Sequence, residues 1–182
     1  MWHKLNKCYP PTLELIPFLL LVLTVYLAFS NYSILPEKLP IDFDSRGVPE
    51  EWNSKNVVVF LYFGVGVFIY LLLTASNIWF AVTGDPKSLI NLPKKWKAAL
   101  NDVQTEKLRV ILNRYLFILK ILIQSMILYL LYSSIEIALE RTGSIGTPMT
   151  LLVVAIFIII ALMVWKSFSI SRTPHRNVTR GN

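Results

Sequence analysis

The side chains that could do acid-base or nucleophilic chemistry are few in this chain and lie far apart. The sequence of 182 residues holds two histidines, His3 and His175, and a single cysteine, Cys8. A Ser-His-Asp triad, a Cys-His pair and a histidine-ligated metal site all need these residue types close to further partners. One cysteine also excludes an intramolecular disulfide and a thiolate cluster for zinc. We therefore predict that the protein is not an enzyme and binds no cofactor.

Carboxylates gather in the one long polar stretch of the first half of the chain, residues 34–56. Asp42 and Asp44 are two positions apart, so in an extended chain both side chains point to the same face. Glu50 or Glu51 could add the oxygen ligands that calcium prefers. This spacing is common, and a solvated acidic edge is the simpler interpretation. We predict no metal site and keep these four carboxylates as alternative ligands.

The rest of the chain is dominated by apolar runs. Hydrophobic residues make up 54% and charged residues 16%, which is too apolar for an ordinary soluble domain. A bilayer core about 30 Å thick needs roughly 20 apolar residues per helix. We predict an all-α integral membrane protein with four transmembrane helices, at residues 13–30, 57–82, 109–137 and 149–166.

The distribution of basic residues predicts the orientation in the membrane. The segments 1–12, 83–108 and 167–182 are basic. By contrast, segment 31–56 has three basic residues against five acidic ones, and segment 138–148 has a single basic residue. The positive-inside rule places the first three segments in the cytoplasm and the other two outside. We therefore expect both termini inside a cell membrane and the polar stretch outside.

The net charge of +7 could indicate either nucleic acid or a membrane surface as the partner. Lys94, Lys95 and Lys97 surround Trp96 next to a predicted helix end. Cations at such an interface attract anionic lipids, with about 1 kcal/mol for each one. Nucleic-acid binding would need a longer basic stripe on a folded domain. We predict the lipid bilayer, and not nucleic acid, as the partner of these charges.

We single out four polar residues within the predicted helices: Glu14, Asn77, Lys120 and Gln124. Ionisable groups are costly inside a bilayer. Glu14 and Lys120 both fall in the cytoplasmic half, so we predict that they pair, with separate snorkelling to the headgroups as the alternative. Gln124 lies one turn beyond Lys120 on the same face. Asn77 is expected to form hydrogen bonds between helices rather than to bind a substrate.

The third helix is predicted to be longer than the membrane is thick. Asn101 and Gln104 have the spacing of a capping box, so the helix should begin near residue 102 and continue to about residue 137. Its first turns would then project into the cytoplasm. There we expect a solvated charged face, made of Asp102, Glu106, Lys107 and Arg109. The basic tail 167–182 is expected to be disordered.

The polar stretch 34–56 is more restrained than a connector between helices needs to be. It holds three prolines, which fix the backbone, and Gly47. One interpretation is a docking surface, because prolines lower the ordering cost of binding. The other is a lid folded onto the helices. We favour the lid for Trp52 and recognition for Asp42 and Asp44.

The order of residues in this stretch also suggests a family. The residues are Leu35, Pro36, Pro40, Asp42, Phe43, Gly47, Pro49, Trp52 and Lys55. This order resembles the signature LPxxxPxHFxxxGxPDxWxSK of the SdpI-like family of bacterial membrane proteins, and the similarity extends over about residues 10–137. The family usually has histidine where this chain has Asp42, so a histidine-dependent role is not carried over. The chain resembles only the first module of the family, followed by one closing helix.

The resemblance implies an immunity or signalling protein that protects the producing cell from a secreted toxic peptide. On that basis we expect a peptide or protein partner at the polar stretch. An accessory subunit of a larger membrane complex is the alternative, because the uniform apolarity of the helices does not separate lipid-facing from partner-facing surfaces. A small transporter is a third possibility, although only Glu14 and Lys120 are ionisable at depth. The oligomeric state stays open.

Overall fold

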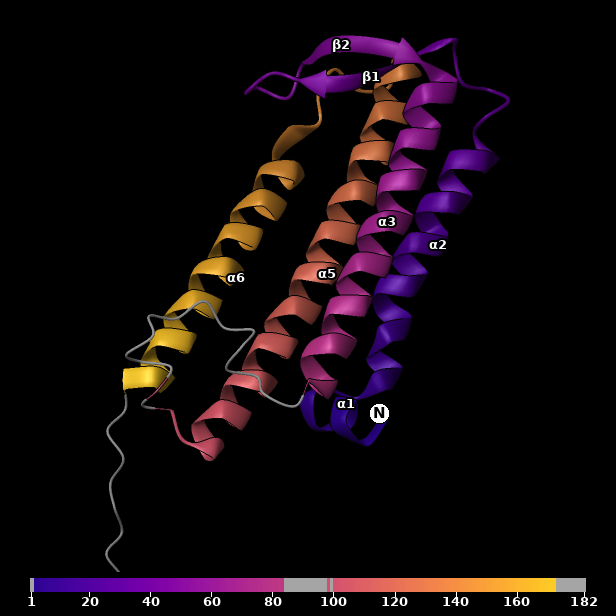
Figure 1. The fold of residues 1–182 in the computed structure, drawn as a ribbon. Helices are drawn as coiled ribbons and strands as arrows, with labels where there is room; N and C mark the ends of the chain where they lie inside the picture. Colours follow the sequence, from indigo (N-terminus) through magenta and orange to yellow (C-terminus); the bar gives the residue numbers. More distant parts are fainter. Residues whose placement is uncertain (1, 84–97, 99, 173–182) are drawn as a thin grey trace, which may run out of the picture.

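The computed structural model describes residues 2–83, 98 and 100–172 (Figure 1). Among these residues the structure is mostly helical, with one short pair of strands. The elements are α1 (Trp2–Cys8), the 3-10 turn η1 (Pro11–Glu14), α2 (Leu15–Ser30), β1 (Lys38–Phe43), β2 (Pro49–Ser54), α3 (Lys55–Val82), α5 (Asp102–Ala138) and α6 (Gly146–Arg172). Residues 94–97, from which we predicted a contact with lipid, lie outside the described residues, as does most of the predicted basic loop.

Four helical segments of the described chain are long and apolar enough to cross a membrane. They are Pro11–Ser30, Lys55–Val82, Asp102–Ala138 and Gly146–Ser171. Each contains one of the four segments predicted from the sequence, so a multi-pass membrane protein with four transmembrane helices is confirmed. The direction in which the chain crosses the membrane stays a prediction.

The last helix continues beyond its predicted end. We expected it to stop at residue 166 and the tail to be disordered, but α6 runs on to Arg172. The extra turns are stabilised by packing, because Phe168 and Ile170 contact a small buried cluster formed by Leu100 and Leu108. The side-chain amide of Gln104 also donates a hydrogen bond of 3.2 Å to the carbonyl of Ile170. The predicted disorder is therefore wrong for residues 167–172.

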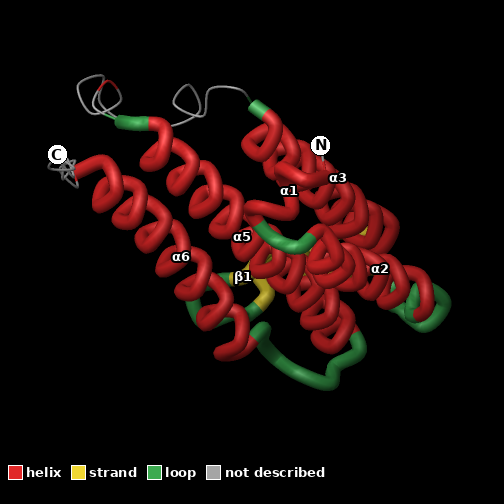
Figure 2. The backbone as a smooth tube through the Cα atoms, turned by 90° about the horizontal axis from the view of Figure 1, so that it is seen from below, coloured by secondary structure: helices red, strands yellow, loops and turns green. Residues whose placement is uncertain are grey.

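The helices form a compact core of three, with the fourth on one side. Helices α2, α3 and α5 pack against one another, and α6 packs mainly against α5, away from α2 and α3 (Figures 1 and 2). Gly66 of α3 lies between α2 and α5. A Cβ atom at Gly66 would lie 3.4 Å from Leu21 of α2 and 3.7 Å from Ile127 of α5. The missing side chain therefore allows this close packing.

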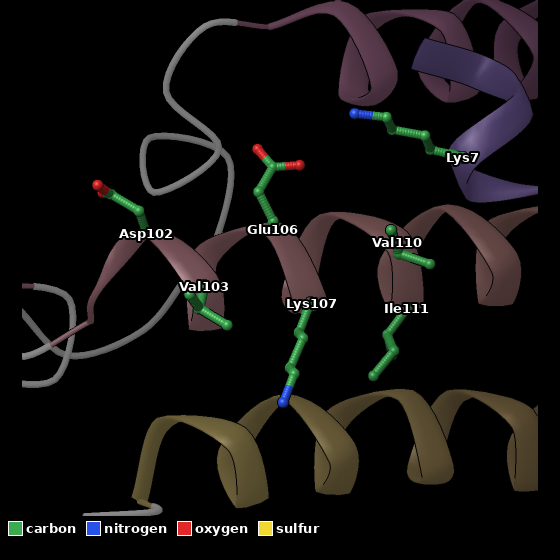
Figure 3. A pocket seen from close by; sticks show the side chains of 7 residues that line it. All are labelled: Lys7, Asp102, Val103, Glu106, Lys107, Val110 and Ile111. Atoms are coloured by element: carbon green, nitrogen blue, oxygen red, sulfur yellow. The ribbon is translucent and has the colours of Figure 1, made fainter. Parts of the chain in front are cut away.

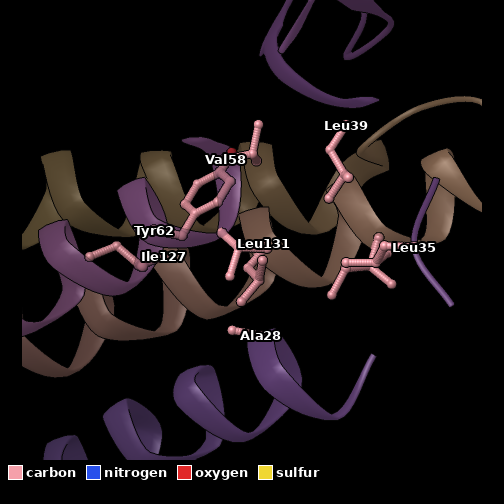
Figure 4. Packing of buried hydrophobic residues seen from close by; sticks show 9 residues of the cluster. Ala28, Leu35, Leu39, Val58, Tyr62, Ile127 and Leu131 are labelled. Carbon is pink, nitrogen blue, oxygen red and sulfur yellow. The ribbon is translucent and has the colours of Figure 1, made fainter. Parts of the chain in front are cut away.

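The largest buried cluster lies at the end of the bundle that carries the strands (Figure 4). It combines Ala28 of α2, Val58 and Tyr62 of α3, and Leu131 of α5 with two residues of the polar stretch, Leu35 and Leu39. Leu39 is fully buried, and Leu35 is 4% exposed. The polar stretch is thus held on the bundle by apolar side chains.

Strands β1 and β2 pair in an antiparallel manner. We call the two strands and the turn between them, residues 38–54, the hairpin. The alternation of residues predicted an extended chain near Asp42, but the second strand was not predicted. The turn depends on Gly47, whose φ of +79° lies in the region that favours glycine. A Cβ atom at Gly47 would lie 2.7 Å from Cγ1 of Ile145. Both the backbone conformation and this lack of space therefore disfavour any larger residue at position 47.

The predicted start of the third helix is confirmed. Helix α5 begins at Asp102, and Asn101 forms a capping box with Gln104. The Asn101 carboxamide oxygen accepts a hydrogen bond of 2.7 Å from the backbone of Gln104. The backbone N–H of Asn101 donates one of 3.1 Å to the Gln104 side chain. The cap satisfies backbone donors that the first turn of a helix leaves free.

Candidate functional site

The predicted site residues are gathered at two places in the structure. The hairpin holds the carboxylates and Trp52, and the interior of the bundle holds the polar residues of the helices. Each place is built by contacts between segments that are far apart in the sequence.

The hairpin is fixed to the bundle at several points. Besides Leu35 and Leu39, Pro40 of β1 is fully buried. The backbone N–H of Ile145, just before α6, donates a hydrogen bond of 2.9 Å to the carbonyl of Gly47. At the other end of the stretch, the Lys55 ammonium lies 3.5 Å from the Glu37 carboxylate. These contacts hold the hairpin as a lid over one end of the helices.

Asp44 builds the turn of the hairpin. Its Oδ1 accepts hydrogen bonds of 2.8 Å from the backbone N–H groups of Arg46 and Val48. Its Oδ2 accepts a bond of 3.0 Å from Nε of Arg46. The hydrogen bond from Val48 is the main cause that holds the pKa of Asp44 below its ordinary value, and Arg46 adds to this effect. The carboxylate is thus engaged inside the turn.

Trp52 does not fold onto the helices, and the lid interpretation of this residue is wrong. Its side chain is 45% exposed. It pairs in register with Pro40, which is fully buried. The contact with the helices is made instead by Leu35 and Leu39, which belong to the buried cluster shared with the bundle.

Asp42 and Glu51 lie directly opposite each other in the hairpin, next to Trp52. Both carboxylates are exposed, as is the neighbouring Glu50. The hairpin region has ion pairs between Arg46 and Asp44 and between Lys55 and Glu37, and none at these three carboxylates among the described residues. The register of the two strands shifts on both sides of Asp42. The result is a concentrated negative charge at a fixed position.

The four alternative metal ligands do not form one cluster. Asp42 and Glu51 face each other, but Asp44 is engaged in the turn. Within the described part of the chain, no group of three or more His, Cys, Asp and Glu side chains is arranged to hold a metal ion. Of the remaining signature residues, Pro36 is exposed, Phe43 pairs with Pro49 and is partly buried, and Lys55 begins α3.

The predicted pair of Glu14 and Lys120 is present inside the bundle. The Lys120 ammonium lies 2.7 Å from Oε1 and 2.8 Å from Oε2 of Glu14, and it donates a further bond of 3.1 Å to the hydroxyl of Thr74. The Lys120 side chain is fully buried, so separate snorkelling to the headgroups does not occur in this structure. The rings of Tyr70 and Phe117 lie 5.8 Å and 5.7 Å from the ammonium and add cation–π contacts.

Tyr9 extends this polar group toward the first helix. Its hydroxyl donates a hydrogen bond to Glu14, and its ring stacks on Phe117 with 4.7 Å between the ring centroids. Burial and then the nearby Glu14 carboxylate raise the pKa of Tyr9 well above its ordinary value. Tyr9 therefore stays protonated and acts as a donor at neutral pH.

Asn77 and Gln124 form hydrogen bonds between helices, as expected for Asn77. The Asn77 amide donates a bond of 3.1 Å to the backbone carbonyl of Asn113. The Gln124 amide donates one of 2.9 Å to the carbonyl of Gly66. Both side chains are fully buried. These contacts fasten α3 to α5 at two levels of the bundle.

The predicted solvated face at the start of α5 needs one correction. Arg109 is buried, with only 7% of its surface exposed. Its guanidinium donates a hydrogen bond of 3.0 Å to the carbonyl of Ala81, at the end of α3, and lies 3.3 Å from Glu106. The last carbonyls of a helix have no partner within the helix, so a cation is favourable at this point. Arg109 thus belongs to the interior, whereas the other three residues of that face are exposed.

Sequence reasoning missed several members of these networks, namely Tyr9, Thr74 and Asn113. A signal for Asn113 was available, because Asn113, Phe117, Lys120 and Gln124 recur at steps of three and four along one face of α5. Helix α1 was also missed. It buries Leu5 and Cys8 against Ala81 and Phe117, which places Tyr9 next to Glu14.

Part of the chain matches a known protein family. Residues 19–67 match a family model that is described as a domain of unknown function, DUF1648. The matched segment includes most of α2, the hairpin and the first part of α3, and it excludes α5 and α6. No curated protein and no solved structure matches the chain.

Proposed function

We propose that this multi-pass membrane protein binds a peptide or protein partner at its hairpin. The observation that carries the proposal is the exposed pair of Asp42 and Glu51 next to the exposed Trp52, on a hairpin that is fixed to the helices. Like charges that face each other across two strands destabilise a sheet. A basic group of a partner would remove this repulsion by binding between the two carboxylates.

The surroundings of the pair favour a basic, partly extended partner. Tryptophan is among the residues that contribute most to binding energy at interfaces. A sheet of two strands leaves an unpaired edge on each strand, to which an extended segment can add. Because the hairpin is already held by Leu35, Leu39 and Gly47, little ordering is needed on binding.

The resemblance of residues 34–56 to the SdpI-like signature supports an immunity or signalling role. In that case the partner would be a toxic peptide or a signalling protein.

The alternative role, an accessory subunit of a larger complex, is favoured by the exposed apolar surface of α6. None of the apolar window of α6 is buried in the described structure, and Leu151 and Phe157 are 63% and 67% exposed. A transporter has less support, because Glu14 and Lys120 form an ion pair that Tyr9 and Thr74 complete.

The experiment that tests the proposal is quantitative purification from native membranes in mild detergent. The tagged wild-type protein is compared with a Glu51→Gln, Trp52→Ala double variant, at matched abundance. Glu140→Gln is the matched control, because Glu140 is an exposed carboxylate near the same end of the bundle. We expect a bound partner to be lost from the hairpin variant and retained by the control.

The same experiment separates the two roles. A partner that stays on the hairpin variant but is lost from a Leu151→Ala, Phe157→Ala variant would refute binding at the hairpin and support the accessory subunit. Recovery of the same proteins with the wild type and both variants would contradict both proposals.

A further inference from the structure

A cavity of about 320 Å³ lies between α5 and α6, at the end of the bundle away from the hairpin. It is lined by Ile111, Arg114, Tyr115 and Ile118 of α5 and by Lys166 of α6. This volume falls within the range of roughly 300–1,000 Å³ that is typical of small-molecule sites. Two cations and two isoleucines therefore share one small space.

The cavity lies on the face of α5 that does not contact the core. Its four α5 residues recur at steps of three, four and seven, which places them on one side of the helix. Asn113 and Lys120, which bind α3 and Glu14, project from the other side. The cavity is thus separate from the buried polar network.

The two cations of the cavity have no acidic partner within the described residues. Ion pairs to a carboxylate are formed there by Arg46, Lys55, Arg109, Lys120 and Arg141, but not by Arg114 or Lys166. Nε of Arg114 donates a hydrogen bond of 2.8 Å to the carbonyl of Cys8, which orients the guanidinium. That bond uses one of its five N–H groups.

Lys166 is next to a residue typical of membrane interfaces. Its ammonium lies 5.0 Å from the centroid of the Trp165 ring, and Trp165 is 60% exposed. Tryptophan and lysine together mark the level of the lipid headgroups. This is also the side that the basic segments predict to be cytoplasmic.

A second cavity, of about 580 Å³, adjoins the first at Ile111 (Figure 3). Its lining is mixed in charge, with Lys7 and Lys107 opposed by Asp102 and Glu106. In Figure 3, Lys107 extends toward α6, while Lys7 enters from α1. This second space lacks the uncompensated positive charge of the first, so an anion is better accommodated between Arg114 and Lys166.

We propose that Arg114 and Lys166 bind the phosphate of an anionic phospholipid. The phosphate would lie between the guanidinium and the ammonium, and the acyl chains would extend from Ile118 along the groove of α5 and α6 into the membrane. Basic pockets between transmembrane helices on the cytoplasmic side suit anionic headgroups. The apolar residues of the cavity distinguish a lipid from a free phosphate ion, which has no surface to place against isoleucine.

Native mass spectrometry of the full-length protein in detergent tests the site, with phosphatidylglycerol and phosphatidylcholine as probes. We expect one phosphatidylglycerol to be retained in preference to phosphatidylcholine. Lys166→Gln and Arg114→Gln should each weaken its binding about fivefold, the value of one interfacial cation. Arg114→Lys keeps the charge and should retain most of the affinity, and Lys38→Gln, an exposed lysine of the hairpin, is the matched control.

If Arg114→Gln fails to fold, Lys166→Gln still tests the proposal. This variant is expected to fold, because the interaction described for the Lys166 side chain is its contact with the neighbouring Trp165 ring. Equal retention of the two lipids by the wild type would overturn the proposal, as would unchanged binding of phosphatidylglycerol to Lys166→Gln. Inorganic phosphate is added alone in a parallel thermal-stability measurement. If it stabilised the protein as much as the lipid does, the site would be one for free phosphate and the lipid assignment would be refuted.

Discussion

The Lys120 ammonium lies 2.7 Å from the Glu14 carboxylate, so one ion pair joins residues that are 106 positions apart in the sequence. The contact fastens the start of the first membrane segment to the middle of α5. Two charges are costly to bury, and removing either partner leaves the other uncompensated. The pair thus fixes which faces of the two helices can meet.

We predict that Glu14→Gln lowers the free energy of unfolding by about 3 kcal/mol, since it leaves the fully buried Lys120 ammonium without its ion pair. Lys120→Met should cost less, because Glu14 is 22% exposed and keeps the hydrogen bond from Tyr9. The double variant should cost clearly less than the sum of the two single changes. Unfolding in mixed micelles with increasing denaturing detergent measures these free energies. Strictly additive losses would show that the two side chains do not interact.

Gly47→Ala is expected to destabilise the attachment of the hairpin. The new Cβ would lie 2.7 Å from Ile145, at a φ of +79° that alanine adopts only at a cost of about 1–2 kcal/mol. The thermal midpoint should therefore fall. Gly143→Ala is the control, because a Cβ there meets nothing within 4 Å. Equal midpoints for the two variants would contradict the close contact of Gly47 with Ile145.

The turn of the hairpin should open in acid. Because hydrogen bonds to the carboxylate hold the pKa of Asp44 below the ordinary value of 3.8, its contribution to stability is complete above that pH. The contribution is lost as the pH falls through the lowered pKa of the folded state. Hydrogen exchange of the Val48 amide, corrected for the intrinsic rate, should accelerate in this acidic range.

Asp44→Asn is the matched variant for the pH experiment. Its carboxamide oxygen can still accept bonds from the turn but does not titrate, so protection of Val48 should become independent of pH. A wild-type turn whose protection is constant down to pH 2 would contradict the role of the Asp44 charge.

The helices were predicted well from the sequence because the thickness of the bilayer sets the length of the apolar run that a membrane-spanning helix needs. The pair of Glu14 and Lys120 was also predicted, since an ionisable group deep in the membrane needs a partner.

Three features were not predicted correctly. Arg109 was assigned to a solvated face because the sequence does not show that the end of α3 lies beside it. The second strand, Pro49–Ser54, was missed because its residues do not alternate between apolar and polar. Trp52 was misplaced because burial within a loop depends on the register of the hairpin.

Cys8 should react slowly with maleimide in the folded protein. The thiol is fully buried, and burial raises its pKa, so little thiolate forms at neutral pH. Arg114 donates a hydrogen bond to the carbonyl of Cys8 and thereby holds α1 against α5. Arg114→Gln should release α1 and increase the labelling rate, whereas Arg141→Gln, just beyond the C-terminal end of α5, should not. Labelling of the wild type as fast as in denaturing detergent would show that α1 does not stay docked on the bundle.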